Sequence, residues 1–407
     1  MNRTLVEQLN ENIDNLVSLT GYIDNYREFK DFGFLFLRDR TGTCQVVVPK
    51  VSCQDKINRG DIVTLNGNVK RNEKSKYLGI EILAERISIL SKRLVGNSLV
   101  EKDSTNISLE QKLERRPDSL RLKAVREIFE FESQWLFKLR EFLNRNGFLE
   151  VSTPKIVEGI NEGGSSVFRL DYFGRQAELS QSPQLYHQML LAALERVYEI
   201  GNCFRAEKYS TQRHVNEYQS LDFQLAFTFS GDEIMNFVEE MLTSSLAEHN
   251  VLGYKIPRIS YNEAQRILKK TSIDKLSGAE KKILGGWAKE ESRSDFLFLH
   301  TFPLKLCQFY TMPKDESYGD SLKLLYKGVE VATGGQRIHD LKLLKSSMMG
   351  KKMNQDNFIH YIEAFELGIP PHGGASMGIP RFVALMKNLV NIKEAIYFPR
   401  DPRRLSP

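Results

Sequence analysis

Residues 180–227 read SQSPQLYHQMLLAALERVYEIGNCFRAEKYSTQRHVNEYQSLDFQLAF, and the rest of the chain is organised around this stretch. Apolar residues alternate through 197–200 and again through 218–227, which predicts two strands joined by a polar loop. Such a hairpin places two arginines, a histidine and the ring of Tyr218 on one surface. Guanidinium groups of Arg205 and Arg213 suit phosphate oxygens, and an aromatic ring suits a base. The hairpin therefore predicts a nucleoside triphosphate site, with a solvated hairpin of scattered charges as the alternative.

Two motifs in this stretch carry a family resemblance. FRAE (204–207), a short loop and RHVNEY (213–218) resemble motif 2 of the class II aminoacyl-tRNA synthetases. QSPQLY (181–186) resembles the amino-acid-binding segment of aspartyl-tRNA synthetases, closest to the archaeal type. The resemblance covers nearly the whole chain with its motifs in order. The expected fold is α+β, with an N-terminal five-stranded OB-fold β-barrel followed by a class II catalytic domain whose antiparallel sheet is flanked by helices.

The composition fits a globular protein with room for two or three domains. The chain has 407 residues, of which 41% are hydrophobic and 27% charged. Its net charge of +5 permits a nucleic-acid partner without requiring one. The four cysteines show no CxxC spacing, which argues against a zinc site or a disulfide framework. No apolar run approaches the roughly 18 residues of a membrane span, so we expect a cytoplasmic protein without membrane association.

The N-terminal part, residues 1–100, contains five short apolar runs separated by turn residues, as in a small barrel. The predicted strands are Leu16–Ile23, Phe32–Leu37, Cys44–Val48, Ile62–Val69 and Ile80–Leu90. The segment 33–46 resembles the anticodon-binding barrel of aspartyl- and asparaginyl-tRNA synthetases. The resemblance implies that Phe34 stacks on an anticodon base and that Gln45 hydrogen-bonds a base edge. The alternative places Phe34 in the barrel core together with Phe36.

Residues 101–117 are polar and predict a linker with one short helix, after which residues 118–407 form the catalytic domain. Apolar spacing predicts a helix over 126–144, followed by an extended segment that ends at Pro154. This unit resembles motif 1, which implies a homodimer, and a core helix followed by a strand is the alternative. Residues 230–294 are helical and charged in pattern. They predict a helical insertion without recognisable chemistry.

Two motifs follow in the last third of the chain. LLYKGVEVATGGQR (324–337) holds Glu330, Thr333 and Arg337 at positions that match functional residues of the family. HGGASMGIPR (372–381) resembles motif 3, a strand that leads into a helix. Pro380 suits the first turn of that helix, where its missing N–H costs nothing.

The resemblance implies that the protein activates aspartate with ATP and transfers it to tRNA, with Mg²⁺ as a further cofactor. Arg205 and Arg381 would be catalytic, with Arg205 bridging the amino-acid carboxylate and the α-phosphate. Glu330 and Thr333 would bind the metal ion. The implied ATP-binding residues are Arg205, Glu207, Arg213, His214, Tyr218, Glu330, Gly378 and Arg381. The implied amino-acid-binding residues are Glu162, Gln184, His187, Asp222, Thr333 and Arg337.

Four positions depart from the aspartyl pattern. His187 stands where the family has lysine, and Lys323 stands where it has an acidic metal-site residue. Gln224 and Pro380 both replace glutamates. Lys323 either offsets charge at the pyrophosphate, with Glu330 orienting it, or points to solvent from a strand. His187 is either protonated beside Asp222 and the substrate carboxylate, which keeps aspartate as the substrate, or neutral, which favours a less charged side chain.

Three functions stay open at this point. The first is an aspartyl-tRNA synthetase, with charging of tRNA-Asn in addition to tRNA-Asp undecided. The second is a paralogue of the same fold that activates a different amino acid or uses another acceptor. The third is a catalytically weak tRNA-binding protein. The expected partners are tRNA, aspartate or a related amino acid, and a second copy of the chain.

Overall fold

The computed structural model describes residues 2–52, 56–94, 99, 107–159, 167–249 and 255–407. The chain folds into two compact units, Met1–Arg126 and Glu127–Pro407. The predicted amino-acid-binding residue Glu162 lies outside the described residues. In the part of the chain that is described, no helix is long and apolar enough to cross a membrane.

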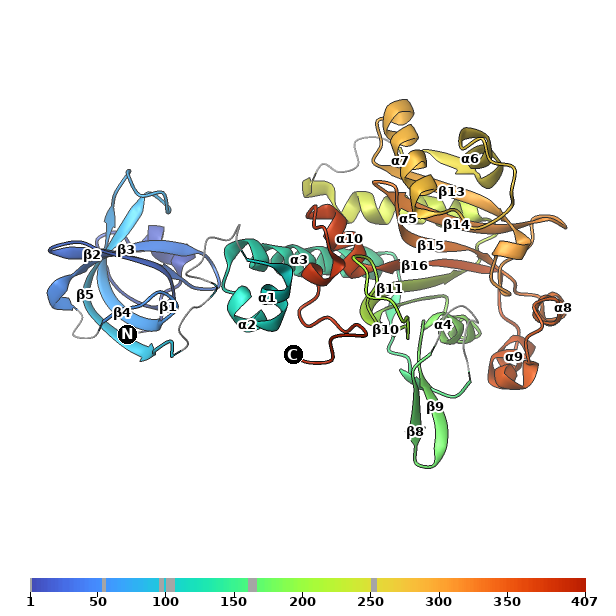
Figure 1. Ribbon diagram of the computed structural model, residues 1–407, viewed down its shortest axis with the longest axis horizontal. Helices are drawn as coiled ribbons and strands as arrows, with labels where there is room; N and C mark the ends of the chain where they lie inside the picture. The colour runs from blue at the N-terminus through green and yellow to red at the C-terminus, as the bar shows by residue number, and fades with distance from the viewer. Residues whose placement is uncertain (1, 53–55, 95–98, 100–106, 160–166, 250–254) are drawn as a thin grey trace. The chain divides into compact units, whose positions relative to one another are not determined.

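The first unit is built on a closed barrel with the strand order β1-β2-β3-β5-β4 (Figure 1, blue). Its strands pair antiparallel, except that β3 and β5 run parallel. The predicted five-stranded OB-fold barrel is confirmed. The strands are β1 (Leu16–Glu28), β2 (Phe32–Arg38), β3 (Thr43–Pro49), β4 (Ile62–Arg71) and β5 (Ile80–Ser91).

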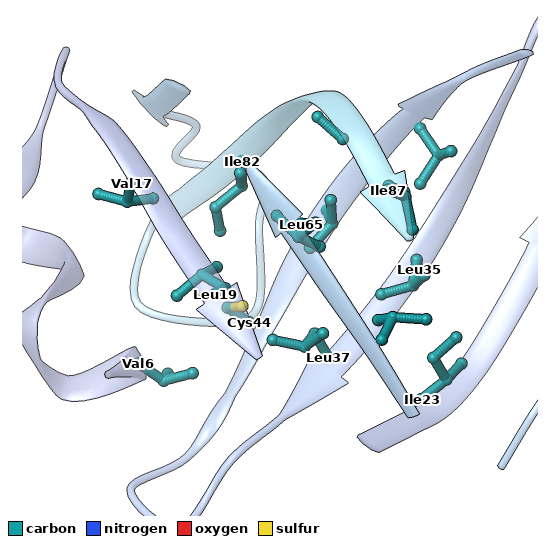
Figure 2. Close-up of a cluster of buried hydrophobic side chains, with 14 of the residues drawn as sticks. Val6, Val17, Leu19, Ile23, Leu35, Leu37, Cys44, Leu65, Ile82 and Ile87 are labelled. Atoms are coloured by element: carbon teal, nitrogen blue, oxygen red, sulfur yellow. The ribbon is translucent and has the colours of Figure 1, made fainter. Parts of the chain in front are cut away.

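Side-chain alternation along β2 separates the inside of the barrel from its outside. Leu35 and Leu37 are fully buried and belong to the barrel core, which Figure 2 shows. Phe34 and Phe36 alternate with these leucines and are only partly buried. Because neighbouring side chains in a strand point to opposite faces, both rings lie on the outer surface. The alternative that placed Phe34 in the core is therefore wrong.

The barrel is followed by the helices α1 (Leu109–Glu114) and α2 (Arg116–Ser119). Helix α1 begins with a capping box, in which the Gln111 amide N–H donates to Ser108 Oγ at 3.2 Å. The Ser108 N–H donates in return to Gln111 Oε1 at 3.3 Å. This reciprocal pair satisfies two N–H groups that a helix start leaves unpaired.

The second unit contains a large sheet with the strand order β12-β13-β14-β15-β16-β11-β10-β6 (Figure 1, green to red). It is antiparallel apart from the end pairs β12–β13 and β10–β6. A smaller sheet has the order β7-β9-β8. The strands are β6 (Leu149–Glu150), β7 (Ile156–Val157), β8 (Arg169–Tyr172), β9 (Arg175–Leu179), β10 (Arg196–Phe204), β11 (Glu217–Ala226), β12 (Arg258–Ser260), β13 (Phe296–Pro303), β14 (Tyr318–Tyr326), β15 (Val329–Arg337) and β16 (His372–Gly378).

Helices flank this sheet, as predicted for the class II catalytic domain. Trp135 of α3 joins three of them, because its ring stacks on Phe382 of α10 and its indole N–H donates to Ser245 Oγ at the end of α5. The helices are α3 (Lys123–Arg145), α4 (Gln184–Leu190), α5 (Gly231–Ser245), α6 (Tyr261–Ile267), α7 (Gly278–Ser292), α8 (Leu341–Gly350), α9 (Ile359–Glu366) and α10 (Ile379–Met386).

The segment 230–294, predicted as a helical insertion, contains α5, α6 and α7 together with the short strand β12. Strand β12 pairs in parallel with β13 and so belongs to the large sheet. Helix α7 contacts β13, β14 and β15. The segment is therefore packed onto the large sheet.

The two faces of β11 differ in chemistry. Leu221 and Phe223 are buried on one face, where the Phe223 ring packs against Phe148 and against Phe237 of α5. The side chains that alternate with these two point to the opposite face and are polar or aromatic. They are Tyr218, Ser220, Asp222 and Gln224. One face of the strand thus anchors the sheet to its helices, and the other carries the candidate site residues.

Candidate active site

The β10–β11 hairpin holds the predicted motif 2 residues. Phe204 pairs with Glu217 at its end, so residues 205–216 form the connecting loop. Buried Asn216 braces this loop, because its Nδ2 donates to the carbonyl oxygens of Arg205 at 2.7 Å and Glu207 at 3.0 Å. Its backbone N–H donates to the Arg400 carbonyl oxygen at 2.7 Å. The asparagine of the RHVNEY motif thus fixes the part of the loop that presents Arg205 and Glu207.

A cavity of about 280 Å³ opens beside this hairpin. It is bounded by β11, β15, β16, the start of α10 and the hairpin loop. All the predicted ATP-binding residues line it, and the predicted metal and amino-acid residue Thr333 lines it as well. The lining residues are Arg205, Glu207, Arg213, His214, Val215, Tyr218, Ser220, Glu330, Val331, Ala332, Thr333, Ser376, Gly378, Pro380, Arg381 and Ile392.

One side of the cavity offers a flat aromatic surface with cations around it. The Arg205 guanidinium carbon lies 5.8 Å from the Tyr218 ring centroid. Burial raises the pKa of the Tyr218 hydroxyl, so the ring stays neutral. Gly378 lies beside this ring, since a Cβ on it would be 4.0 Å from Tyr218 Cε2. Arg381 donates to the carbonyl oxygens of Glu330 at 3.3 Å and Arg213 at 3.4 Å, which ties its guanidinium to both sides of the cavity.

The other side of the cavity is dominated by Glu330 of β15. Its Oε2 lies 3.0 Å from Lys323 Nζ of β14 and 2.5 Å from Lys281 Nζ of α7. Burial opposes ionisation of this carboxyl, but the charges and hydrogen bonds of Lys323 and Lys281 outweigh it and lower the pKa of Glu330 to about 2. Lys323 therefore faces the cavity carboxylate, and of the two orientations open from the sequence, the one that pairs it with Glu330 is found.

This arrangement decides how well a resident magnesium ion fits the predicted residues Glu330 and Thr333. Mg²⁺ binds through oxygen ligands, commonly one or two carboxylates together with substrate phosphates. Here the Glu330 carboxylate already has two ammonium groups within 3.0 Å, and a cation at the same oxygen would be repelled by both. Within the described ranges, no group of three His, Cys, Asp or Glu side chains could hold a metal ion. The donor set does not suit a divalent cation held by the protein.

Arg337, at the end of β15, is the predicted partner of a substrate carboxylate. It is buried, its Nη2 donates to the Gly374 carbonyl oxygen at 3.4 Å, and its guanidinium lies over the Tyr310 ring at 5.1 Å. In the amide orientation that satisfies its hydrogen bonds, Gln184 Oε1 accepts from Arg337 Nε at 3.2 Å and from Nη2 at 3.3 Å. Two predicted amino-acid-binding residues therefore contact each other, and Gln184 fixes the direction of the guanidinium.

His187 of α4 is fully buried beside a carboxylate that the sequence analysis missed. Its Nε2 lies 3.4 Å from Glu199 Oε2. Lys155 Nζ lies 2.5 Å from Glu199 Oε1, and Thr153 Oγ1 donates to Oε2 at 2.7 Å. Burial works against the charged form of Glu199, but its contact with His187 and its hydrogen bonds from Lys155 and Thr153 outweigh burial and lower its pKa to about 2. An ionised Glu199 thus lies beside the imidazole.

Asp222, another predicted amino-acid-binding residue, lies directly across from Glu199 in the β10–β11 pairing. It is buried, and burial raises the pKa of its carboxyl against the opposing effects of the Ser220 hydroxyl and of nearby His187. Ser220 also contacts Ser376 of β16, with 3.1 Å between their hydroxyl oxygens. These contacts extend from the lined cavity, where Ser220 and Ser376 lie, to the buried histidine.

Two of the four departures from the aspartyl pattern, Gln224 and Pro380, remain to be placed in the structure. Gln224 is buried on the same face of β11 as Asp222, and Pro380 occupies the first turn of α10 on the cavity wall, as predicted.

The functional candidates missed from the sequence are Lys155, Glu199 and Lys281. Lys155 precedes its partner by 44 residues and Lys281 precedes Glu330 by 49. No local pattern connects residues so far apart, and the sequence signal at Lys281 was no more than two consecutive lysines, 281 and 282, near the start of α7.

The barrel carries a second candidate surface, described by itself. Phe34 makes edge contacts with Phe32 at 5.3 Å and Phe29 at 5.8 Å between ring centroids, and Phe29 and Phe32 stack on each other. Gln45 lies opposite Phe36, and its Nε2 donates to Glu81 Oε2 at 3.2 Å. Phe29 and Phe32 are exposed. The barrel thus presents an aromatic cluster, Phe29, Phe32 and Phe34, on its outer surface.

Comparison with known proteins identifies both parts of the chain. Residues 108–402 match the family of class II tRNA synthetases (D, K and N), and residues 17–90 match the OB-fold nucleic acid binding domain. The chain is 35% identical to the aspartate–tRNA(Asp) ligase of Thermoplasma volcanium, over 99% of this chain and 98% of that protein. It is also 35% identical to the aspartate–tRNA(Asp/Asn) ligase of Thermus thermophilus over the full length of both.

A solved structure from the same family has the same fold over the full chain. The asparaginyl-tRNA synthetase of Pyrococcus horikoshii complexed with asparaginyl-adenylate superposes with a TM-score of 0.90 at 28% identity, covering 100% of both chains. The predicted resemblance to archaeal-type aspartyl-tRNA synthetases is confirmed by these relatives. The chain belongs to the class II tRNA synthetases (D, K and N) and carries an OB-fold nucleic acid binding domain.

Proposed function

We propose that the protein is an aspartate–tRNA ligase that activates aspartate with ATP and transfers it to tRNA. The observation that carries this proposal is that all eight residues assigned to ATP line the same cavity. The Arg337–Gln184 pair holds a carboxylate-binding guanidinium on β15, the strand that also carries Glu330. Relatives that match the full chain and are named aspartate–tRNA ligases support the same conclusion.

The first step is a nucleophilic substitution at the α-phosphorus of ATP. A carboxylate oxygen of aspartate attacks this phosphorus, the bond to the bridging oxygen breaks, and pyrophosphate leaves with the electron pair. Both reactants are negatively charged, so fixed cations must stabilise the charge that develops between them. The Arg205 guanidinium would bind the α-phosphate and the aspartate carboxylate at the same time. Arg213, His214 and Arg381 would hold the outer phosphates, and Tyr218 would stack on the adenine, with Arg381 over its other face.

The second step passes the acyl group to tRNA. A terminal ribose hydroxyl attacks the carbonyl carbon of the adenylate, and AMP leaves. The barrel would position the tRNA by its anticodon, with the ring of Phe34 stacked on an unpaired base and Gln45 bonding a base edge. The neighbouring rings of Phe29 and Phe32 support this role because they extend the stacking surface.

Arg337 favours a substrate with a side-chain carboxylate. Its guanidinium is oriented by Gln184 and by the Gly374 carbonyl, and a pre-oriented fork suits bidentate contact with a carboxylate. The family model also includes asparagine and lysine enzymes. The buried His187–Glu199 contact is the observation that favours a paralogue with another amino acid, because it pairs the imidazole with a protein carboxylate rather than leaving it for the substrate.

For the assembly we propose a homodimer in the cytoplasm, formed through α3 and the following strand. Phe137 of α3 and Leu149 of β6 are large apolar residues with 64% and 53% of their surface exposed, which supports a partner on this side. Light scattering should give twice the chain mass. A monomer that still activates an amino acid would contradict this part of the proposal.

The test of the function is ATP–pyrophosphate exchange with each amino acid, with and without tRNA. Aspartate should give the highest rate of exchange. A preference for another amino acid would assign the chain to a paralogue. Exchange with none of them would leave the tRNA-binding function and contradict the enzyme.

A further inference from the structure

Lys281 has no role in the function derived so far, although its ammonium contacts Glu330, a residue that lines the cavity. It comes from α7, in the segment for which the sequence offered no chemistry. Its ammonium and that of Lys323 converge on the same oxygen, Glu330 Oε2, at 2.5 and 3.0 Å. The two lysines approach from different elements, a helix and a strand. Such convergence places two positive charges side by side at the wall of the ATP cavity.

Close contacts along α7 fix its position beside the cavity. A Cβ on Gly278, at the first position of the helix, would lie 3.5 Å from Arg213 Nη1. A capping box between Ser277 and Glu280 fixes this end of the helix. Gly285, one turn beyond Lys281, packs so closely on Gly328 that its added Cβ would lie 2.6 Å from the Gly328 backbone. The helix is therefore held against the β14–β15 turn, and Lys281 is directed to Glu330 by a rigid element.

The charge on this side is suited to a polyanion. Glu330 balances one of the two lysines, and Arg213 and Arg381 add further positive charge close by. Both lysines retain exposure, with 18% and 29% of their side chains accessible, so each can turn from the carboxylate to a ligand. Lys ammonium groups are compact phosphate binders that act as point charges.

We propose that Lys281 and Lys323 bind the outer phosphates of ATP as a pair, in place of a divalent cation held by the protein, with Glu330 orienting both ammonium groups. The proposal rests on the assignment of this cavity to ATP. It makes Lys281 a further substrate-binding residue. It also explains why the carboxylate on this wall is already occupied by protein cations rather than being open to a metal ion.

The test is equilibrium binding of ATP in EDTA and in excess MgCl₂, measured by calorimetry on the full chain. Wild type should bind magnesium-free ATP at least as tightly as magnesium-bound ATP. Lys281→Gln and Lys323→Gln should each weaken binding of magnesium-free ATP by about tenfold, the loss expected for one charged hydrogen bond. Lys323→Asp should make ATP binding depend on magnesium. Lys289→Gln is the matched control, because Lys289 lies on the same helix and pairs with Asp295 at the surface.

AMP separates the possible failures, since it lacks the outer phosphates. Each lysine variant should bind AMP as wild type does, which also shows that the cavity is still folded. A wild type that binds ATP only with magnesium, or a Lys281→Gln variant with unchanged ATP affinity in EDTA, would overturn the proposal. If wild type binds neither AMP nor ATP, the assignment of the cavity to ATP fails instead.

Discussion

The two walls of the cavity differ in how they are built. The base wall (Arg205, Tyr218 and Gly378) is a braced hairpin with one strand beside it, and its residues are those expected of the family. The lysine wall consists of Glu330, which lines the cavity, and of Lys281 and Lys323, which pair with it; it is assembled from a helix and two strands and holds two ammonium groups on one carboxylate. Under the proposed function, the comparison implies that phosphate binding has changed on one wall while recognition of the base is kept on the other.

The largest expected effect is on the base wall. Arg205→Ala should lower the rate of aspartate activation about 10³-fold, because a fixed charge at a developing oxyanion is typically worth 10²–10³. ATP–pyrophosphate exchange measures this loss. Arg175→Ala is the control, since Arg175 is an exposed arginine of the β8–β9 hairpin. If Arg205→Ala exchanged at the wild-type rate, the base wall would have no part in the chemistry.

The next effect concerns Glu199 of β10, which contacts Lys155 and His187. Its pKa is lowered from 4.5 to about 2, which corresponds to about 3 kcal/mol of folding free energy. Because the folded pKa is the lower one, this contribution is present above about pH 4.5 and is lost as the pH falls towards 2. Glu199→Gln should therefore unfold more easily than wild type at pH 7, and the difference should shrink in acid.

Urea unfolding of both proteins at pH 7 and pH 3 measures that difference. Glu158→Gln is the control, because Glu158 pairs with Arg175 while 69% of its side chain is exposed. A difference between wild type and Glu199→Gln that stays constant from pH 7 to pH 3 would contradict the paired, ionised state of Glu199.

A smaller effect is expected from the brace of the base wall. Asn216→Ala removes two hydrogen bonds from the loop carbonyls of Arg205 and Glu207, each worth about 1 kcal/mol. The KM for ATP should rise by roughly tenfold or more. Asn202→Ala serves as the control, since Asn202 is an exposed residue of the same hairpin that donates to half-buried Glu217. An unchanged KM in the Asn216 variant would show that the loop orders itself without the brace.

The smallest effect belongs to the barrel, outside the cavity. Phe34→Ala should weaken tRNA binding by about tenfold, at the low end of the 1–3 kcal/mol expected for a stacked base, because Phe29 and Phe32 remain. Amino-acid activation should be unchanged. Phe36→Ala is the control on the same face of the strand, where Phe36 packs on Tyr77. Equal tRNA affinity in wild type and a folded Phe34 variant would remove the anticodon role.

The sequence was sufficient for the barrel, the motif 2 hairpin and the base wall. Alternation predicted the five barrel strands and the strands on either side of Arg205, because period-two burial is a local signal. The resemblance to motifs 2 and 3 implied that Tyr218 and Arg381 belong to one site, and both line the cavity. The burial of Phe34 stayed open because alternation alone does not say which face of a strand is inside.

What could not be predicted depends on contacts between distant segments. Lys281 approaches Glu330 only because α7 packs on the turn between β14 and β15. Glu199 meets both Lys155 and His187 only when β10, the segment after β6 and α4 are brought together. The departures at His187 and Lys323 were visible in the sequence, but their partners were not. The contacts of Glu199 and Lys281 were needed to show which charges these two residues face.

The most direct test of the central claim is the charging of tRNA with radiolabelled aspartate by the purified wild-type protein. The proposed function predicts that ATP, aspartate and tRNA together give aspartyl-tRNA, and that omission of any one of them gives none. Pyrophosphate exchange with aspartate but no aspartyl-tRNA would assign another acceptor to the enzyme. Charging of tRNA with a different amino acid, and not with aspartate, would contradict the assignment of Arg337 and Gln184 to a substrate carboxylate.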